Sequence, residues 1–562
     1  MGVDSRHAMR SVRDRLEAAM VAHQGGDLAG AISGYSGVLE SDPRQPDALH
    51  YLGVALAQQG SLAEAVTFLG QALDLRPDDP EILRNLAGVL FRQGESLSAL
   101  QHIDRSLQLD AGNSAALITR GAVLRALGRS TEAVAGYEAV LSREPTNLAA
   151  LSNLGNALLR LERFDEALRA YDETLFAEAR QVDAVVGQAS VYREINKLTL
   201  SRASYDYALQ LDPYRLATWT AKAGVEQALK RFDDALTSVA RAAELNGASD
   251  EARWNSALIR LNLGQWETGF AEYESRFTRS DYRQRHHEVY PFPVLTRGCE
   301  IKGRRVLVHA EQGLGDSLQF CRFVARLVRE GADVTLLAPK PLVELFRESP
   351  ALGCSVESEV ALTGYDFHIP LMSLPAIFGT TIESIPFAEE PYLHASQQRA
   401  EGWDAALGDR RQVRIGIMWS GGTGSKLRGR SIPLRDFAAI IDPKFDWISL
   451  QKELSSEDQD LLSRVMAIRH FGDAQHGFAD TAAMIVNCDL VISVDTSVAH
   501  LSGALGKETW LLLPHAADWR WLENRDDSVW YPKVRLFRQS RAGDWRGILQ
   551  RISRELMRFQ SE

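Results

Sequence analysis

Apolar residues in the first half of the chain recur at the three-to-four-residue spacing of an amphipathic helix, as in residues 164–171. Small residues and prolines recur on a longer, fixed scale of 34 residues or a multiple of 34, at Ala31, Ala65, Ala99, Ala133, Ala167 and Ala235, at Pro43, Pro77, Pro145 and Pro213, and at Gly53, Gly121 and Gly155. A small residue lets two helices touch closely, and proline cannot continue a helix. Each 34-residue unit is therefore predicted to be a pair of packed helices.

This period, with small residues and prolines so placed, is typical of tetratricopeptide repeats. Counting by 34 gives about eight units, of which the last spans residues 251–277. Ser201 and Gly269 stand where alanine is usual. We predict that residues 1–283 form an α-solenoid with a concave groove. Such an array indicates recognition of another protein.

Three asparagines, Asn85, Asn153 and Asn255, occupy the same position in their repeats. A ladder of amides along the groove would hold the backbone of an extended peptide, because each amide both donates and accepts hydrogen bonds. These asparagines are therefore candidate acceptor-binding residues. The alternative interpretation is that they are solvated polar positions on a helix face.

The pattern changes after residue 283. A polar segment and the sequence Pro291-Phe292-Pro293 mark a linker. Short apolar runs, many of them rich in β-branched residues, then predict strands at residues 305–310, 333–338, 366–370, 413–418, 446–450, 490–494 and 510–513, with helices at 317–329, 431–441 and 480–486. A polar stretch, residues 396–412, separates the two groups. Alternating strands and helices are typical of parallel sheets, so we predict two Rossmann-like α/β domains, residues 284–400 and 401–562.

Polar turns follow several of these strands, at the edge where α/β sheets bind ligands. Residues 311–316 form a glycine-rich turn that lacks the full dinucleotide fingerprint. Residues 419–424 form a loop suited to cradling phosphate, and Lys426, Arg428 and Arg430 follow it. Asp495, Thr496 and Ser497 are all able to cap the next helix, whose free N–H groups attract anions.

Composition disfavours several kinds of binding partner and site. The net charge of −11 disfavours general attraction to nucleic acid or to anionic membranes. The four cysteines have neither a metal-ligand nor a disulfide spacing. There is no apolar run of about 18 residues that would span a membrane, and the first 15 residues lack the apolar core of a signal peptide. We expect a cytoplasmic protein without integral membrane contact.

Longer motifs resemble a known family. Residues 311–320 (EQGLGDSLQF) and 494–506 (VDTSVAHLSGALG) resemble two motifs of bacterial glycosyltransferases fused to tetratricopeptide repeats, and residues 254–276, 518–521, 530–532 and 536–539 also match. The α/β halves are similar to the lipopolysaccharide heptosyltransferase family. The layout resembles O-linked N-acetylglucosamine transferase and the repeat-type flagellin glycosyltransferases. The resemblance implies a GT-B pair, with the acceptor on the first half and a nucleotide-sugar donor on the second.

The resemblance also implies roles for individual residues. Asp316 is the expected general base. Asp495, Thr496 and His500 are expected to contact the donor phosphates together with Arg430, for which Lys426 and Arg428 are competitors. We extend the donor-binding candidates to Gly315, Trp419, Ser420, Gly421, Gln451, Lys452, Ser497 and Val498, and the acceptor-binding candidates to Glu311 and Gln312. No Asp-x-Asp pair ends a strand in this part, so we expect no required metal or other cofactor.

Each role has a structural alternative. Asp316 would also serve as a cap of the helix that follows, and His500 as a packed core histidine. Glu311 and Gln312 would also serve to orient the turn. Trp519 and Trp521 are predicted to pack rather than to stack on a sugar.

The sequence leads to one main hypothesis and two alternatives. The main one is a protein O-glycosyltransferase that moves a sugar from a CMP-, UDP- or ADP-linked donor to Ser or Thr of a protein held by the repeats. By resemblance, the acceptor is flagellin and the sugar a nonulosonic acid such as pseudaminic acid. The alternatives are a non-catalytic repeat adaptor or chaperone with a vestigial transferase domain, and a heptosyltransferase-like enzyme with a glycan acceptor.

Overall fold

The computed structural model describes residues 4–246, 250–279, 282, 290–361, 363–421, 429–464 and 467–559. The chain divides into two compact units, Met1–Thr218 and Trp219–Glu562. The predicted domain boundaries at residues 283 and 400 both fall inside the second unit, which therefore contains the last repeats together with the α/β halves.

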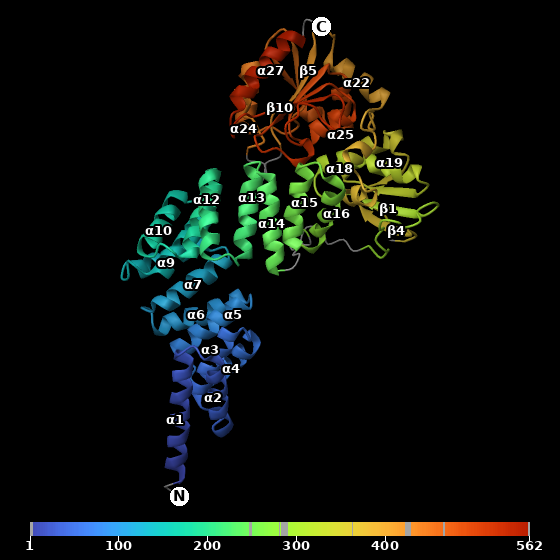
Figure 1. The fold of residues 1–562 in the computed structure, drawn as a ribbon. Coiled ribbons are helices and arrows are strands. Elements are labelled where there is room, and N and C mark those ends of the chain that lie inside the picture. Colours follow the sequence, from blue (N-terminus) through green and yellow to red (C-terminus); the bar gives the residue numbers. More distant parts are fainter. Residues whose placement is uncertain are drawn as a thin grey trace. The chain divides into compact units, whose positions relative to one another are not determined.

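The N-terminal unit is built of helix pairs in which each helix packs on the next (Figure 1). Its helices are α1 (Asp4–Gln24), α2 (Leu28–Ser41), α3 (Pro46–Gln59), α4 (Leu62–Leu75), α5 (Pro80–Arg92), α6 (Ser96–Leu109), α7 (Ser114–Ala126), α8 (Ser130–Leu141), α9 (Leu148–Arg160), α10 (Phe164–Ala177), α11 (Val182–Glu194) and α12 (Leu198–Leu211). The second unit opens with four further helices, α13 (Leu216–Ala228), α14 (Phe232–Asn246), α15 (Asp250–Asn262) and α16 (Trp266–Tyr273), of which α13 begins just before the boundary. The predicted α-solenoid is present.

The periodic small residues lie where the helices touch. Ala31, Ala65 and Ala99 are fully buried. A Cβ atom added at Gly121 would lie 2.5 Å from the ring of Tyr137, so only glycine allows this approach. Ser201 replaces alanine in its repeat because its buried hydroxyl donates a hydrogen bond to the Ala189 carbonyl at 2.7 Å.

The second unit adds two parallel sheets. The first has the strand order β3-β2-β1-β4 and the second β10-β9-β8-β5-β6-β7. The strands are β1 (Arg305–His309), β2 (Asp333–Leu337), β3 (Ser355–Glu357), β4 (Phe367–Pro370), β5 (Arg414–Met418), β6 (Asp446–Ser449), β7 (Ile468–His470), β8 (Leu490–Val494), β9 (Thr509–Leu513) and β10 (Val534–Arg538). All paired strands within each sheet are parallel, as predicted.

Helices cover both sheets. The α-helices are α18 (Leu314–Phe320), α19 (Arg322–Arg329), α20 (Lys340–Arg347), α21 (Leu374–Ile377), α22 (Gln397–Leu407), α23 (Leu434–Phe437), α24 (Ser456–Arg464), α25 (Phe478–Val486), α26 (Ser497–Ala504) and α27 (Trp545–Phe559). Short 3₁₀ helices are η1 (Glu274–Thr278), η2 (Pro350–Leu352), η3 (Leu371–Ser373), η4 (Ile382–Ser384), η6 (Ala438–Ile440), η7 (Gly472–Ala474) and η8 (Trp519–Trp521).

Three predictions of secondary structure were wrong in detail. The single helix predicted at 317–329 is two helices, α18 and α19, that break at Cys321. The polar stretch 396–412 contains α22, which buries Trp403 and Leu407 on one side. The helix predicted at 431–441 is the short α23 followed by η6.

One hydrophobic core joins the last repeat to both sheets. Trp266 of α16 stacks on Trp530 at 4.7 Å between ring centroids. Phe270 of the same helix meets Phe320 of α18 edge-on at 6.4 Å and Trp519 of η8 at 5.6 Å. Helix α16 accordingly lies beside α18 (Figure 1), and α15 packs against η8. The last helix pair is thus part of the same packed body as the sheets.

Candidate functional site

The turn after β1 positions the first group of site residues, Gln312, Gly315 and Asp316. Gln312 has a φ of 62°, and its amide hydrogen-bonds the hydroxyl of Tyr273 at 3.0 Å. The next residues start α18, where a Cβ atom added at Gly315 would lie 3.1 Å from His500 Cδ2. Glycine at this position therefore lets the start of α18 pack closely against α26 of the second half.

Asp316 lies in the first turn of α18, and both of its oxygens are engaged. Oδ2 accepts a hydrogen bond from the N–H of Gly313 at 2.9 Å, so the predicted capping role is present. Oδ1 is paired with Nη2 of Arg520 at 2.5 Å. Burial raises the pKa of Asp316 although Arg520 opposes the shift. An ionised carboxylate has about four lone-pair sites, so both oxygens still have room to accept a proton.

Arg520 links the two halves of the unit. Its guanidinium also pairs with Asp518 at 2.8 Å and donates to the Gln319 side chain at 2.7 Å. Burial alone would lower the pKa of Arg520, but the carboxylates of Asp518 and Asp316 outweigh burial and raise it. The arginine is therefore a fixed positive charge between two carboxylates.

The turn after β8 supplies the second cluster. Thr496 is the N-cap residue of α26, with extended backbone angles. The Asp495 side chain before it is buried, and Nη1 of Arg430 lies 3.5 Å from its Oδ2. That oxygen accepts no hydrogen bond from any described residue. Burial and the neighbouring Asp518 raise the pKa of Asp495 to about 6.

This pKa predicts a pH-dependent effect of replacing Asp495 by asparagine. Because the folded-state pKa of about 6 exceeds the ordinary value of about 3.9, the stability contributed by the protonated carboxyl is present below pH ~4 and is lost as the pH rises through 6. Asn cannot ionise, so Asp495→Asn is expected to add about 1–3 kcal/mol to the free energy of unfolding at pH 8 and nothing at pH 4. Urea unfolding at both pH values measures this.

The matched control is Asp436→Asn, at a side chain that is 53% exposed. It controls for the replacement of a surface carboxylate by an amide. An equal gain for Asp495→Asn at pH 4 and pH 8 would show that the carboxyl is not held protonated by its surroundings.

His500 is both packed and adjacent to the cluster. Its Nδ1 shares a hydrogen bond with the hydroxyl of Tyr531 at 3.0 Å, and its ring stacks on Trp521 at 5.2 Å. Burial, reinforced by Arg520, lowers the pKa of His500 to about 3, so its ring is neutral at physiological pH. A neutral imidazole acts as a hydrogen-bonding group here and not as a cation for phosphate.

These turns line one cavity of about 570 Å³. Of the residues predicted from the sequence, it brings together Gln312, Gly315, Asp316, Gly421, Arg430, Asp495, Thr496, Ser497 and His500. The other lining residues are Trp254, Leu258, Tyr273, Gly313, Leu314, Met418, Asp518, Trp519 and Arg520. Both halves and the last repeat thus contribute side chains to a single site.

Other predicted donor residues do not line this cavity. Trp419 is buried in the core, where its indole N–H donates to Asp458 at 3.2 Å. Val498 is buried as well, and the Ser420 hydroxyl is hydrogen-bonded to Ser431 at 3.2 Å. Gln451 and Lys452 follow β6 and are not among the lining residues. Lys426 and Arg428 lie outside the described residues.

Glu311 is buried in an ion pair and does not face the cavity as an acceptor-binding residue would. It is buried, and both of its oxygens pair with the buried guanidinium of Arg276 from η1, at 2.7 and 3.1 Å. The hydroxyl of Tyr282 donates to the same carboxylate. Arg276 and Tyr282 lower the pKa of Glu311 against the opposing effect of burial. The pair ties the last repeat to the turn that carries Gln312 and Asp316.

The three repeat asparagines are half-buried. The Asn85 amide hydrogen-bonds His50 of the preceding repeat at 2.7 Å. The Asn153 amide donates to the Ala149 carbonyl of its own helix at 2.8 Å. Asn255, on α15, is next to Trp254 in sequence. Contact of these residues with a peptide stays a prediction.

Sequence analysis missed Arg520, Asp518 and Trp254 as site residues. Residues 518–521 carried a recognisable motif, but only the tryptophans in it were weighed as ligand contacts. Those tryptophans are largely buried, as predicted, although Trp519 also lines the cavity. The signal that could have found Arg520 and Asp518 is the presence of an Asp-x-Arg pair inside the same motif.

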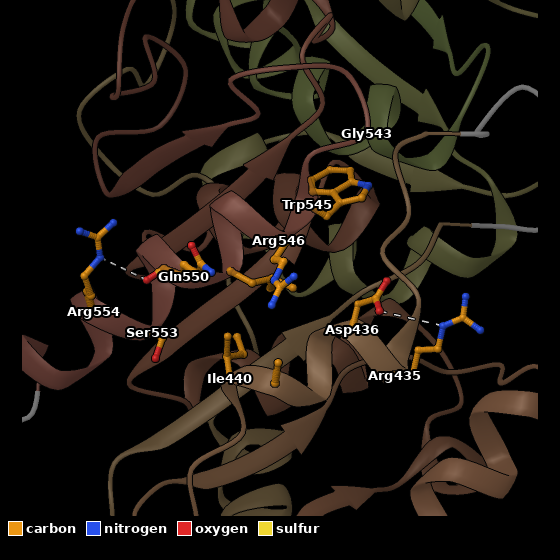
Figure 2. Close-up of a pocket in the computed structure, with 11 residues that line it drawn as sticks. Arg435, Asp436, Ile440, Gly543, Trp545, Arg546, Gln550, Ser553 and Arg554 are labelled. Atoms are coloured by element: carbon orange, nitrogen blue, oxygen red, sulfur yellow. Dashed lines mark hydrogen bonds and ion pairs between the residues drawn. The ribbon is translucent and has the colours of Figure 1, made fainter. Parts of the chain in front are cut away.

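A second concavity, of about 990 Å³, shares no residue with the first. Figure 2 shows it between the residues of α23 and η6 and those of α27. Arg435 pairs with Asp436 at 4.0 Å, and Arg554 donates to the Gln550 carbonyl at 3.4 Å. These arginines thus have partners within the groove, whereas several of the residues predicted to bind a donor line the cavity around Asp316.

Within the described residues, none of the His, Cys, Asp and Glu side chains form a group of three or more that could hold a metal ion. No helix within the same ranges is long and apolar enough to cross a membrane.

Comparison with known proteins confirms the repeats. Residues 55–94 match the family model described as TPR repeat, and residues 118–175 and 152–215 match that described as tetratricopeptide repeat. Protein FlbA of Caulobacter vibrioides is 23% identical over 384 residues, which cover 63% of either chain. The chain thus spans less than two thirds of the length of this curated relative.

Solved structures resemble parts of the chain. A tetratricopeptide repeat protein from Parabacteroides merdae is 18% identical, with a TM-score of 0.40, and the match covers 44% of this chain and 99% of that one. TTC0263, a thermophilic TPR protein of Thermus thermophilus, is 21% identical, with a TM-score of 0.31, over 33% of this chain and 100% of that one.

Proposed function

We propose that the protein is a GT-B glycosyltransferase that moves a sugar from a nucleotide-linked donor to a Ser or Thr hydroxyl of a polypeptide held by the repeats. The observation that carries the proposal is the single cavity in which the turn after β1 meets the turn after β8. Ligands of parallel α/β sheets bind at the carboxyl ends of the strands. A cavity that two such sheets share is suited to bind two groups side by side, here the donor nucleotide and the acceptor hydroxyl.

The donor phosphate fits the second half. Arg430 is 37% exposed on its side chain and lines the cavity beside the N-terminus of α26. The first N–H groups of a helix have no partners within the helix and favour an anion. A leaving phosphate placed there would replace Asp495 and Asp518 as the partner of Arg430. The charge that develops as the sugar–phosphate bond breaks would then be stabilised.

The acceptor hydroxyl fits the first half. Its oxygen attacks the anomeric carbon of the sugar, the bond from that carbon to the phosphate oxygen breaks, and the nucleotide leaves with the bonding electrons. Asp316 takes the hydroxyl proton. Burial raises the pKa of this carboxyl, which makes it a stronger base than an exposed aspartate. Its pairing with Arg520 keeps it ionised and in place before the reaction.

The acceptor class follows from the repeats. Tetratricopeptide arrays support a protein-interaction role, and their groove suits an extended polypeptide. A glycan acceptor would make no use of such an array. The resemblance to the repeat-type flagellin glycosyltransferases points to flagellin as the acceptor, and to a CMP-linked nonulosonic acid as the donor.

Nucleotide binding tests the donor site. Titration calorimetry of the full chain with CMP, UDP and ADP is expected to show that one of them binds. Arg430→Ala should weaken that binding by about tenfold or more, because a hydrogen bond to a charged group contributes about 1.5–3 kcal/mol. Arg435→Ala, in the groove of Figure 2, is the matched control and should leave the affinity unchanged.

The same titration separates the enzyme from a non-catalytic adaptor. An adaptor with a vestigial transferase domain would bind none of the three nucleotides. Equal loss of affinity in Arg430→Ala and Arg435→Ala would place the nucleotide outside the cavity around Asp316.

A further inference from the structure

Helices α15 and α16 of the last repeat form one wall of the cavity. Trp254 and Leu258 of α15 and Tyr273 of α16 line it together with Asp316. The rings of Trp254 and Tyr273 lie 4.9 Å apart, and the guanidinium of Arg279 lies 5.1 Å from the Trp254 ring. We call Trp254, Leu258 and Tyr273 the repeat wall.

The repeat wall is fixed to the turn after β1, residues 311–316. The hydroxyl of Tyr273 is hydrogen-bonded to Gln312, four residues before Asp316. Burial raises the pKa of Tyr273 to about 12, so it stays a neutral phenol. The Arg276–Glu311 ion pair holds the same turn from η1. A group bound against the repeat wall would therefore be held in a constant relation to the Asp316 carboxylate.

The chemistry of the repeat wall differs from that of the rest of the cavity. The charged lining side chains Asp316, Arg430, Asp495, Asp518 and Arg520 all lie on the two α/β halves. The repeat wall offers an indole, an isobutyl group and a phenol ring. Trp254 and Leu258 are only half-buried and thus keep surface open. A phosphate gains nothing from these three side chains themselves, whereas an apolar side chain that packs on them gains by leaving water.

We propose that the repeat wall selects the acceptor sequence by binding an apolar side chain that neighbours the modified Ser or Thr. This inference rests on the proposed transfer to a protein hydroxyl. The groove of the repeats would bind the polypeptide. The last repeat would in addition determine which hydroxyl of that polypeptide reaches Asp316. Trp254 is the main specificity-determining residue, with Leu258 beside it.

The test is a double-mutant cycle on acceptor and enzyme, with the full-length protein throughout. The probe is flagellin isolated without its glycan from cells that carry Asp316→Asn, and a second form of it in which the apolar neighbour of one modified residue is changed to Asp. With wild-type enzyme, the change in flagellin is expected to lower kcat/KM at that residue about tenfold or more. With Trp254→Ala, the flagellin that keeps the apolar neighbour should show a similar loss of kcat/KM. Replacing that neighbour by Asp should then have little further effect.

Two further variants guard against a folding defect. Leu258→Ala should show a smaller loss of the same kind, and Trp254→Phe should recover most of the selectivity. The affinity for the nucleotide should change less than twofold in all three variants. Additive losses in the cycle, or a weakened nucleotide affinity with unchanged selectivity, would overturn the inference and leave the proposed function standing. Absence of transfer by the wild-type enzyme would overturn both.

Discussion

Asp316→Asn is expected to lower kcat for sugar transfer by about 10²–10⁴-fold, the usual contribution of a positioned general base. Asparagine keeps the size of the side chain, but its amide cannot take the proton of the acceptor hydroxyl. The affinity for the nucleotide should stay within about twofold, because Asp316 lies on the first half. Single-turnover transfer, measured by the mass of the acceptor, gives the rate.

Asp436→Asn is the matched control for this experiment. Asp316 and Asp436 each occupy the third position of their helix, counted from the N-cap residues Gly313 and Pro433. Asp316 accepts the Gly313 N–H, whereas Pro433 has no N–H to donate to Asp436. Asp436→Asn therefore controls for the loss of a carboxylate from a first helical turn. Transfer by Asp316→Asn at the wild-type rate would reduce Asp316 to the capping role that its bond with the Gly313 N–H already shows.

Arg520→Met is expected to lower the free energy of unfolding of the C-terminal unit by about 3–5 kcal/mol. The substitution removes a guanidinium that is 8% exposed and leaves Asp316 and Asp518 without their main partner. Removal of one member of a buried ion pair costs about this much, since the remaining charge stays buried. All 11 tryptophans lie at or after Trp219, so urea unfolding followed by tryptophan fluorescence reports on this unit.

Arg435→Met is the control for charge removal. The Arg435 side chain is 67% exposed and pairs with Asp436 and Glu457, and exposed pairs contribute about 0–1 kcal/mol. An equally small effect of Arg520→Met would mean that water reaches the two carboxylates, contrary to the burial that raises the pKa of Asp316.

The repeats could be predicted well from the sequence because their constraint is local and periodic. Each helix pair needs a small residue at its crossing point, so Ala65 or Ala99 recurs at a fixed distance whatever the rest of the chain does. Strand β8 was predicted at its observed bounds for a similar reason, since five buried apolar or small residues in a row are visible in the sequence. Three strands were missed. The three-residue strands β3 and β7 are too short to show a pattern, and β10 has arginines among its apolar residues.

Only some of the residues that line the cavity could be predicted from the sequence. Residues in turns after strands, such as Asp316 and Thr496, meet because parallel strands end at one edge. Trp254 reaches the same cavity from a repeat helix. It begins the matched segment 254–276, but nothing in that segment indicates that its side chain faces a cavity. The partner of Glu311 is Arg276, 35 residues away, and only the packing of η1 on the turn after β1 reveals it. Trp419 directly follows β5 but turns into the core.

The cavity around Asp316 is proposed to glycosylate a protein hydroxyl. The most direct test is the intact mass of flagellin isolated from the source organism, with either the wild-type protein or Asp316→Asn encoded at the natural locus. We predict that flagellin from the wild-type strain is heavier by one or more glycosyl residues linked to Ser or Thr, and that flagellin from the variant strain lacks them. Identical masses in the two strains would contradict the account.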